Sequence, residues 1–527
     1  MIAAHDFRTA PFILWLLSLS VFSVISVAKL LSRDVTWPIP IALAMSAAFG
    51  FASQAAAQGA RLPAPVAQAL AQAGIPETAA AVYAHEVGAA EPFLAVEAER
   101  ALNPASVMKL VTTYAGLELL GPAYVWPTEI YSAGALQQDV LGGDLVIKGY
   151  GDPKMTLENF WLLLRNLRGR GVREIRGDLV LDRGYFAGEG FDPGRFDDQP
   201  TRPYNTGPDA LLVNYKAIRL QFIPEPETRS VRIAVEPVLP QIAIVNNLTL
   251  DKAACGDWVS RLKLDAQGGS QQARLAFNGN FSVACGERVR HFSVLGHSQY
   301  IHSLFQELWR EMGGTLTGGV RDGAVGNGAR RLATVQSQTL SEIVRDINKF
   351  SNNVMARQLF LTLGAVGGGA PATAEKSTRT IKQWLAQKGL AAPELVLENG
   401  SGLSRLERIS AENLGRLLVN AFRSAVMPEL IASLPVAAVD GTMRKRLSGA
   451  EVAGQAHIKT GSLAGVRSIA GYVLDNQGRR IVVVLIVNHA NAGAGRPAQD
   501  ALLKWVHNRD ADACCTGDGK QRRKPRK

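Results

Sequence analysis

The sequence predicts an α+β fold, in which helices flank an antiparallel sheet and a large strand-rich segment is inserted into that domain. A helical pattern lies in the first quarter of the chain, and strand-like segments joined by a tight turn lie near its end. The stretch between them alternates apolar and polar residues, which is typical of half-buried strands. The segments are 107–120 for the helix, 457–463, 467–474 and 480–488 for the late strands, 475–478 for the turn, and 231–235 and 273–277 in the middle.

These patterns also suggest a domain organisation. We expect one catalytic domain built from residues 60–126 and 306–508, and one or two inserted domains at 127–305. The segment 79–87 is expected to join the late strands in one sheet, since the turn between those strands favours an antiparallel hairpin. One clear helix near 157–167 is expected within the insertion.

The helix at 107–120 has recognisable start and stop signals. Asn103 is a favoured N-cap residue, and Pro104 is tolerated in a first helical turn. Gly121 and the proline after it end the apolar run. Ser106 is therefore expected in the first turn of this helix.

Ser106 and Lys109 lie three positions apart, so the lysine amine can reach the serine hydroxyl on one helix face. A serine is a poor nucleophile unless a neighbour accepts its proton, and a lysine does so only if burial or nearby positive charge lowers its pKa. Taken alone, the pair is more often an ordinary helix start with a solvated lysine. The same spacing also occurs in an apolar stretch at Ser26 and in a polar region at Ser260.

Ser351, Asn352 and Asn353 form a second string, which follows a helical pattern at 340–347. We expect it at a break between two helices. The Ser351 hydroxyl can relay a proton between a lysine and a leaving group, and the Asn353 amide can bind a substrate backbone or hold Lys109. On its own, the string is a plain helix cap.

Lys459, Thr460 and Gly461 form a third string at the start of the late strands. A strand carrying a cation and a hydroxyl can bind the terminal carboxylate of an extended peptide, and glycine leaves room for an acyl group. The charge of Lys459 can also lower the pKa of Lys109. Alone, the string is a strand that contains a lysine.

In this order, the three strings resemble the penicillin-binding protein and serine β-lactamase superfamily. The long gap between the first two resembles the class C low-molecular-mass penicillin-binding proteins, which are D-alanyl-D-alanine carboxypeptidases and endopeptidases. The resemblance covers about 75–508. Further strings that agree with it are Gly143-Asp144-Leu145, Gly151-Asp152-Pro153, Gly177-Asp178, the segment Gly400 to Arg405, and Asp440-Gly441-Thr442.

The resemblance implies a role for each residue of the three strings. Ser106 becomes the acylated nucleophile and Lys109 its general base, with Ser351 and Asn353 as the second catalytic element. Implied to bind substrate are Lys459, Thr460, Gly461 and Ser462, with the backbone N–H groups of Ser106 and Ser462 as the oxyanion hole and Arg405 as a further candidate.

The implied reaction is two-step acyl transfer on peptidoglycan stem peptides, and β-lactam antibiotics are expected to acylate the same serine. No metal, nucleotide or organic cofactor is expected, since the corresponding motifs are not found in the sequence. Two alternatives stay open. One is a serine β-lactamase on the same scaffold, and the other is a cell-wall-binding module without catalysis.

Composition agrees with an exported enzyme. With 47% hydrophobic and 20% charged residues, the chain can bury a large core and is not disordered. Cys255 and Cys285 are a disulfide candidate outside the cytoplasm, and two free buried thiols are the alternative.

The first 57 residues hold two apolar stretches that end in small residues, which predicts a signal peptide cleaved after Ala57 and a periplasmic enzyme. The alternative is an N-terminal membrane anchor, because about twenty apolar residues can span a bilayer.

The net charge of +11 is uneven, since the tail 509–527, which we expect to be disordered, holds seven Lys or Arg against three Asp. No nucleic-acid partner is expected. The charge suits peripheral contact with a membrane surface or an anionic wall polymer. Cys514 and Cys515 in the tail have no evident role.

Overall fold

The computed structural model describes residues 61–188 and 190–509. The predicted cleavage after Ala57, the alternative anchor, and the basic tail with Cys514 and Cys515 lie outside these residues. Within them, no helix has the length and hydropathy needed to cross a bilayer.

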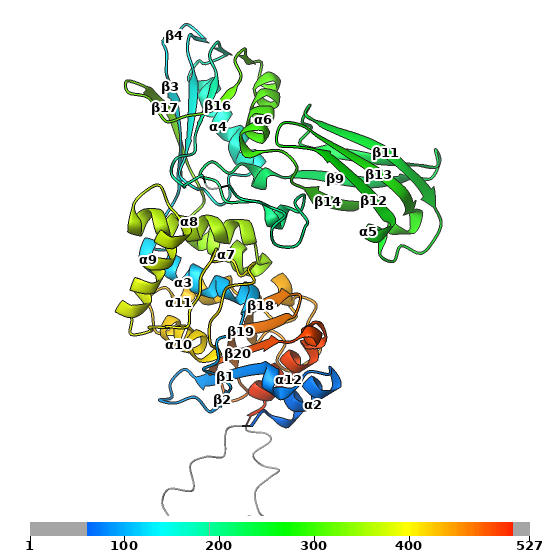
Figure 1. Ribbon diagram of the computed structural model, residues 1–527, viewed down its shortest axis with the longest axis vertical. Helices are drawn as coiled ribbons and strands as arrows, with labels where there is room; N and C mark the ends of the chain where they lie inside the picture. The colour runs from blue at the N-terminus through cyan, green and yellow to red at the C-terminus, as the bar shows by residue number, and fades with distance from the viewer. Residues whose placement is uncertain (1–60, 189, 510–527) are drawn as a thin grey trace, which may run out of the picture. The chain divides into compact units, whose positions relative to one another are not determined.

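The catalytic part is built around a five-stranded sheet with the order β18-β19-β20-β1-β2 (Figure 1). All neighbouring strands in it run antiparallel. Among the described residues, the first strand, β1, therefore pairs with the last, β20, as expected from the sequence. The strands are β1 (Ala80–Glu86), β2 (Leu94–Val96), β18 (Ala456–Leu463), β19 (Val466–Leu474) and β20 (Arg480–Asn488).

The two faces of this sheet pack into separate cores, because side chains alternate along a strand. In β20, Val482, Val484 and Ile486 belong to one core, whereas Val483 and Leu485 belong to the other. Helices α2 (Ala64–Gln72) and α12 (Arg496–His507) cover the second face. The α+β fold with helices flanking an antiparallel sheet is confirmed.

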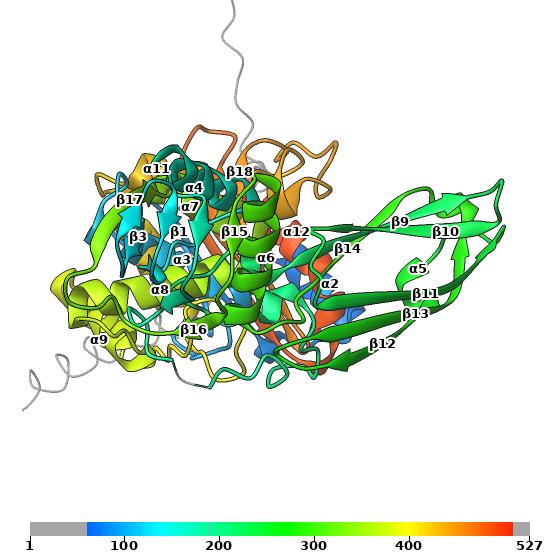
Figure 2. The same ribbon diagram turned by 90° about the horizontal axis from the view of Figure 1, so that it is seen from above.

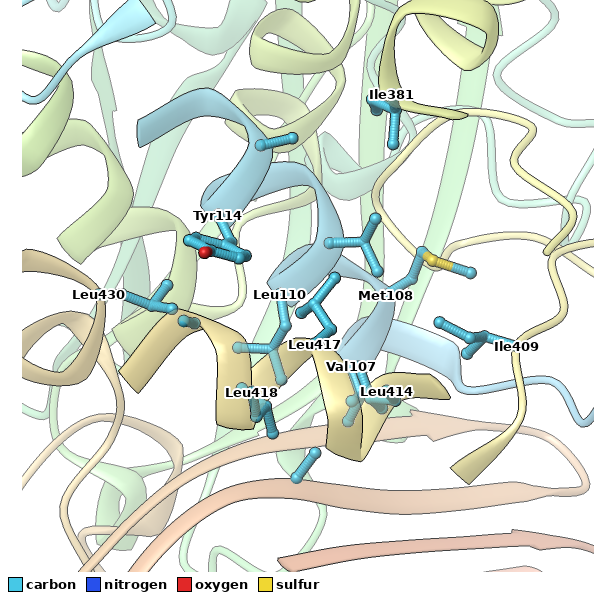
Figure 3. Packing of buried hydrophobic residues seen from close by; sticks show 14 of the residues in the cluster. Val107, Met108, Leu110, Tyr114, Ile381, Ile409, Leu414, Leu417, Leu418 and Leu430 are labelled. Carbon is cyan, nitrogen blue, oxygen red and sulfur yellow. The ribbon is translucent and has the colours of Figure 1, made fainter. Parts of the chain in front are cut away.

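Helix α3 (Lys109–Leu120) lies in the centre of the first core. Figure 3 shows Leu110 and Tyr114 of this helix among leucines of the neighbouring helices. Apolar residues pack around the helix, and close-packed side chains leave it few alternative positions. The surrounding helices are α7 (Leu340–Phe350), α8 (Asn353–Gly368), α9 (Ala374–Gln387), α10 (Ala411–Phe422) and α11 (Met427–Ser433).

The inserted segment begins at β3 and contains a mixed sheet in the order β16-β8-β6-β3-β17 and a smaller one in the order β15-β7-β5-β4. Helices α4 (Leu157–Gly169) and α6 (His297–Glu311) contribute to its core. The strands are β3 (Pro127–Ser132), β4 (Leu136–Gln137), β5 (Val140–Leu141), β6 (Leu145–Gly149), β7 (Glu174–Ile175), β8 (Leu179–Asp182), β15 (Thr315–Leu316), β16 (Val320–Asp322) and β17 (Arg330–Gln336).

The expected end of the insertion at residue 305 needs correction. Strand β16 pairs with β8, and β17 pairs with β3, so the chain returns to the catalytic part only after Gln336. The physical reason is that these late strands complete a sheet whose other strands lie far earlier in the chain. Such non-local pairing leaves no local mark in the sequence.

A second part of the insertion consists of two three-stranded sheets, β10-β9-β14 and β11-β13-β12 (Figures 1 and 2). Phe222 of β9 and Phe277 of β13 meet between them, with ring centroids 5.2 Å apart. Cys255 and Cys285 form a disulfide beside the short helix α5 (Trp258–Arg261). The strands are β9 (Ile218–Glu225), β10 (Ser230–Glu236), β11 (Ile242–Asp251), β12 (Leu262–Gly268), β13 (Ala273–Ser282) and β14 (Arg288–Phe292).

Candidate active site

Ser106 lies in a short 3-10 helix, Ala105–Met108, and α3 begins at Lys109. The first turn is therefore tighter than the α-helical turn expected from the sequence. Asn103 still stabilises this entrance, because its Oδ1 accepts a hydrogen bond from the Ala105 N–H at 2.9 Å. Lys109 Nζ lies 3.0 Å from Ser106 Oγ, so the tighter turn keeps the two groups in contact.

The buried amine of Lys109 has two further partners. It donates to Asn353 Oδ1 at 2.6 Å and to the carbonyl oxygen of Ser401. Both of these oxygens accept hydrogen bonds and cannot donate them. A neutral amine has two N–H groups and one lone pair, so these partners use both N–H groups and leave the lone pair for the Ser106 hydroxyl. The arrangement is suited to a lysine that removes a proton from this serine.

Ser351 lies at the break between α7 and α8, as the sequence predicts. Its φ of 57° turns the chain out of α7, and the side chain of Asn352 then caps α8 by accepting a hydrogen bond from Met355 N at 3.1 Å. This turn brings Ser351 Oγ within 2.8 Å of Lys459 Nζ. The second and third strings therefore meet at a hydroxyl and an amine.

Strand β18 passes directly beside the 3-10 helix of Ser106. A Cβ atom built on Gly461 would lie 2.6 Å from the carbonyl oxygen of Pro104 and 3.1 Å from the backbone nitrogen of Ser106. It would also lie 2.2 Å from Ser468 Oγ, which donates a hydrogen bond to the Pro104 carbonyl. The close approach of strand and helix therefore requires glycine at this position.

Thr460 of the third string and Ser462, which follows it on β18, both face neighbouring side chains. Thr460 Oγ1 lies 2.9 Å from Thr442 Oγ1, which belongs to the Asp-Gly-Thr string noted in the sequence. Ser462 Oγ accepts a hydrogen bond from the guanidinium of Arg467. Hydroxyl and cationic groups therefore extend along β18 from Lys459.

Both lysines of the site are wholly buried, and burial lowers their pKa values because a charged amine loses its hydration. The pKa of Lys459 falls to about 7 for this reason. The pKa of Lys109 falls well below its usual value through burial first, and then through the positive charges of Lys459 and Arg357. Burial and the nearby positive charges therefore favour the uncharged form of Lys109.

The buried Glu407 was not singled out from the sequence. Its Oε1 accepts hydrogen bonds from the backbone N–H groups of Glu398, Asn399 and Gly400, at 3.2, 3.0 and 2.8 Å. These bonds fix the loop that presents the Ser401 carbonyl to Lys109. The negative charge of Glu407 also opposes the lowering of the Lys109 pKa.

Arg405 is not part of the cluster around Ser106. Its guanidinium donates to the carbonyl oxygen of Ala464 at 3.0 Å and lies 4.7 Å from the ring centroid of Phe196. It therefore stands at the turn after β18. No hydrogen bond or ion pair among the described residues joins it to the two lysines or to Ser106.

A family model described as the D-Ala-D-Ala carboxypeptidase 3 (S13) family matches residues 62–509. The chain is 29% identical to a D-alanyl-D-alanine carboxypeptidase of Actinomadura sp., over 76% of this chain and 76% of the relative. It is 25% identical to the D-alanyl-D-alanine carboxypeptidase DacB of Haemophilus influenzae, over 74% of this chain and 81% of the relative.

The fold also matches a solved structure. Penicillin binding protein 4 (dacB) from Haemophilus influenzae has a TM-score of 0.71 at 23% identity, covering 84% of this chain and 99% of the other. That protein has also been solved in complex with a β-lactam, with a TM-score of 0.67 at 22% identity, over 86% of this chain and 99% of the other. The resemblance drawn from the three strings is confirmed, and the chain belongs to the D-Ala-D-Ala carboxypeptidase 3 (S13) family of serine peptidases.

Proposed function

We propose that this chain is a serine D-alanyl-D-alanine carboxypeptidase and endopeptidase, with Ser106 as its nucleophile. The observation that supports this most strongly is the 3.0 Å contact between Lys109 Nζ and Ser106 Oγ. It is supported further by the two acceptors, Asn353 Oδ1 and the Ser401 carbonyl, that take both N–H groups of an uncharged Lys109. Such a pair meets the requirement for an activated nucleophile, a hydroxyl with a base in contact.

In the first step, Ser106 Oγ bonds to the carbonyl carbon of the penultimate D-alanine while its proton passes to Lys109. The carbon–nitrogen bond then breaks, and the departing amine takes a proton. Ser351 Oγ, hydrogen-bonded to Lys459, offers a route for that proton. Water then attacks the ester, which releases the shortened peptide and returns a proton to Ser106 Oγ.

The carboxylate at the end of the substrate is proposed to bind along β18. Lys459 provides a buried positive charge there, and Thr460 with Thr442 provides hydroxyl groups. The backbone N–H groups of Ser106 and Ser462 are proposed as the oxyanion hole. A β-lactam carries a carboxylate and an activated amide in similar positions, so it should acylate Ser106 and leave slowly.

Release of D-alanine from a pentapeptide stem, before and after substitution of Lys109, tests this function. Lys109→Met keeps an apolar chain of similar length and removes the base, and we expect release to fall by roughly a thousandfold or more. The exposed Lys382 offers a control, since Lys382→Met should leave release unchanged. Equal release by Lys109→Met and the unmodified protein would exclude the proposed base.

Labelled penicillin separates this function from its two alternatives. A stable adduct supports a carboxypeptidase, rapid turnover supports a β-lactamase, and no labelling supports a binding module. Among the described residues, no carboxylate hydrogen-bonds to Ser106 or Lys109, so the geometry favours slow release of the drug.

Export remains a prediction from the sequence, with cleavage after Ala57. The family to which the chain belongs is named for D-Ala-D-Ala carboxypeptidase activity, and this supports the proposal of an exported enzyme that acts on the cell wall. N-terminal sequencing of the mature protein tests the cleavage site. Peripheral contact with a membrane or an anionic wall polymer likewise remains a prediction.

A further inference from the structure

Three consecutive residues of the insertion adopt left-handed backbone conformations. Asn214, Tyr215 and Lys216 have φ values of 47°, 53° and 52°. For residues with a side chain this region costs roughly 1 to 2 kcal/mol each, and it is normally visited by single residues. Such strain persists only where the surrounding structure enforces it, and it gathers at sites that bind or react.

The surrounding structure holds this turn firmly. The side-chain amide of Asn214 donates to the Ala217 carbonyl at 3.1 Å and to Tyr300 Oη at 2.8 Å. Tyr300, which is buried in α6, donates to the same carbonyl at 2.8 Å. The turn also closes through a hydrogen bond from Lys216 N to the Val213 carbonyl at 2.8 Å. The position of Lys216 is therefore fixed by several independent contacts.

The strained turn presents Lys216 to a cavity of about 930 Å³ in the insertion. This volume is near the upper end of that of pockets for small organic ligands, and it is far larger than a single ion needs. None of the residues that line it belongs to the three strings around Ser106. The cavity is thus a different site from the one described above.

Within the part of the chain that the structure describes, Lys216 is a cation of this cavity without a direct hydrogen-bond or ion-pair partner, although the charge of Asp209 acts on it from a distance. Arg183, which also lines it, forms ion pairs with Asp209 and Asp322. Asp182 has a partner in Lys148 at 3.3 Å. Among the described residues, Lys216 Nζ has no hydrogen bond and no ion pair.

Burial lowers the pKa of Lys216 to about 8, against the opposing charge of Asp209, so the ammonium form prevails at neutral pH. An unpaired, largely buried ammonium is costly, and a ligand anion would supply the missing partner.

The other residues that line the cavity indicate which chemical groups the ligand carries besides its anionic group. Phe191, which is 45% exposed, contributes an aromatic ring, and Thr201, Gln267 and Ser270 contribute hydroxyl and amide groups. Aromatic faces pack against the C–H faces of sugar rings, while hydroxyl and amide groups bond to sugar hydroxyls and to peptide or acetamido groups. The lining therefore suits a carboxylate-bearing saccharide linked to a peptide.

We propose that this cavity is a second binding site, in which Lys216 pairs with a carboxylate of a peptidoglycan glycopeptide while the substrate peptide occupies the groove of Ser106. The proposal rests on the proposed function, because it takes the ligand from the same polymer. A site of this kind would hold the enzyme on the polymer between cleavage events, since two linked sites bind a polymer more tightly than one.

Calorimetry with a disaccharide tripeptide, which lacks D-alanine and has no scissile bond, tests this site on the mature protein. The protein is first saturated with benzylpenicillin to fill the Ser106 groove. We expect binding of one fragment per protein to persist, and Lys216→Gln to weaken it by about tenfold or more. Lys382→Gln is the matched control and should bind as the unmodified protein does. The uncharged di-N-acetylchitobiose should bind more weakly than the tripeptide.

A second variant addresses the strain. Lys216→Gly relieves the left-handed conformation, so it should raise the thermal unfolding temperature while it weakens fragment binding. Equal fragment binding by Lys216→Gln and the control, or loss of binding on acylation of the unmodified protein, would overturn the proposal. A protein that takes up no penicillin would count against the proposed function, and the comparison of Lys216→Gln with its control would still report on the cavity.

Discussion

Lys459 Nζ lies 2.8 Å from Ser351 Oγ, although 108 residues separate the two along the chain. From the sequence, Ser351 could relay a proton for either of the two lysines. The structure pairs it with Lys459, while Lys109 contacts Ser106 and Asn353. The two buried amines therefore have separate surroundings. We expect Lys109 to serve the nucleophile and Lys459 to serve the carboxylate and the leaving group.

The charge of Lys459 gives a first prediction, on pH. Because burial lowers its pKa to about 7, the amine is charged below this pH and loses its charge above it. We expect KM for a peptide with a free terminal carboxylate to rise as the pH increases through 7. Michaelis–Menten kinetics from pH 5.5 to 9 with this peptide and with its C-terminal amide check this. The same rise in KM for both peptides would contradict a carboxylate bound by Lys459.

Glu407 gives a second prediction. Its negative charge favours the ammonium form of Lys109 and so raises the pKa of that amine. Glu407→Gln keeps an oxygen for the three backbone N–H groups and removes the charge, so the Lys109 pKa should fall. The acid limb of the acylation rate against pH should then move to lower pH by roughly half a unit or more. An unchanged limb would show that Glu407 only holds the loop.

Gly461 gives a third prediction. A methyl group there would collide with Ser468 Oγ and the Pro104 carbonyl, and would displace β18 from Ser106. We expect Gly461→Ala to slow acylation by roughly a hundredfold, as small displacements of reacting groups do. Gly169 is a control at the end of α4, where an added Cβ meets no atom within 4 Å. Stopped-flow measurement of the acylation rate of both variants tests this prediction. Equal rates for the two variants would refute the close approach of β18 to Ser106.

The disulfide gives a fourth prediction. Cys255 and Cys285 close a loop with a sequence separation of 30 residues, and the loss of such a crosslink costs roughly 3 to 4 kcal/mol in a chain-entropy estimate. The Cys255→Ser, Cys285→Ser double variant should therefore unfold at a lower urea concentration. Its acylation rate should be unchanged, since the loop contributes no residue to the Ser106 site. Unaltered urea unfolding would indicate that the crosslink adds no stability.

Much of this site could be predicted from local patterns. The three strings specify which side chains gather, because each lies at a helix start, a helix break or a strand whose signals are short-range. The central sheet could be predicted for the same reason, from a hairpin and one early strand. Ser106, Ser351 and Lys459 are thus brought together as the strings indicate.

The rest depends on tertiary contacts that no local pattern reports. Glu407 and Arg357 matter because they are buried near Lys109, and burial at a single position cannot be read from one sequence. The insertion extends to Gln336 because β16 and β17 pair with strands far away in the chain. The strained turn at Lys216 likewise depends on Tyr300, whose contact with it follows only from the fold.

Mass spectrometry of the intact protein and its peptides after treatment with benzylpenicillin tests whether Ser106 is the nucleophile. We expect a single stable adduct with the mass of the whole drug, located on Ser106 and lost in Ser106→Ala. An adduct on another residue, or one that persists in Ser106→Ala, would contradict it.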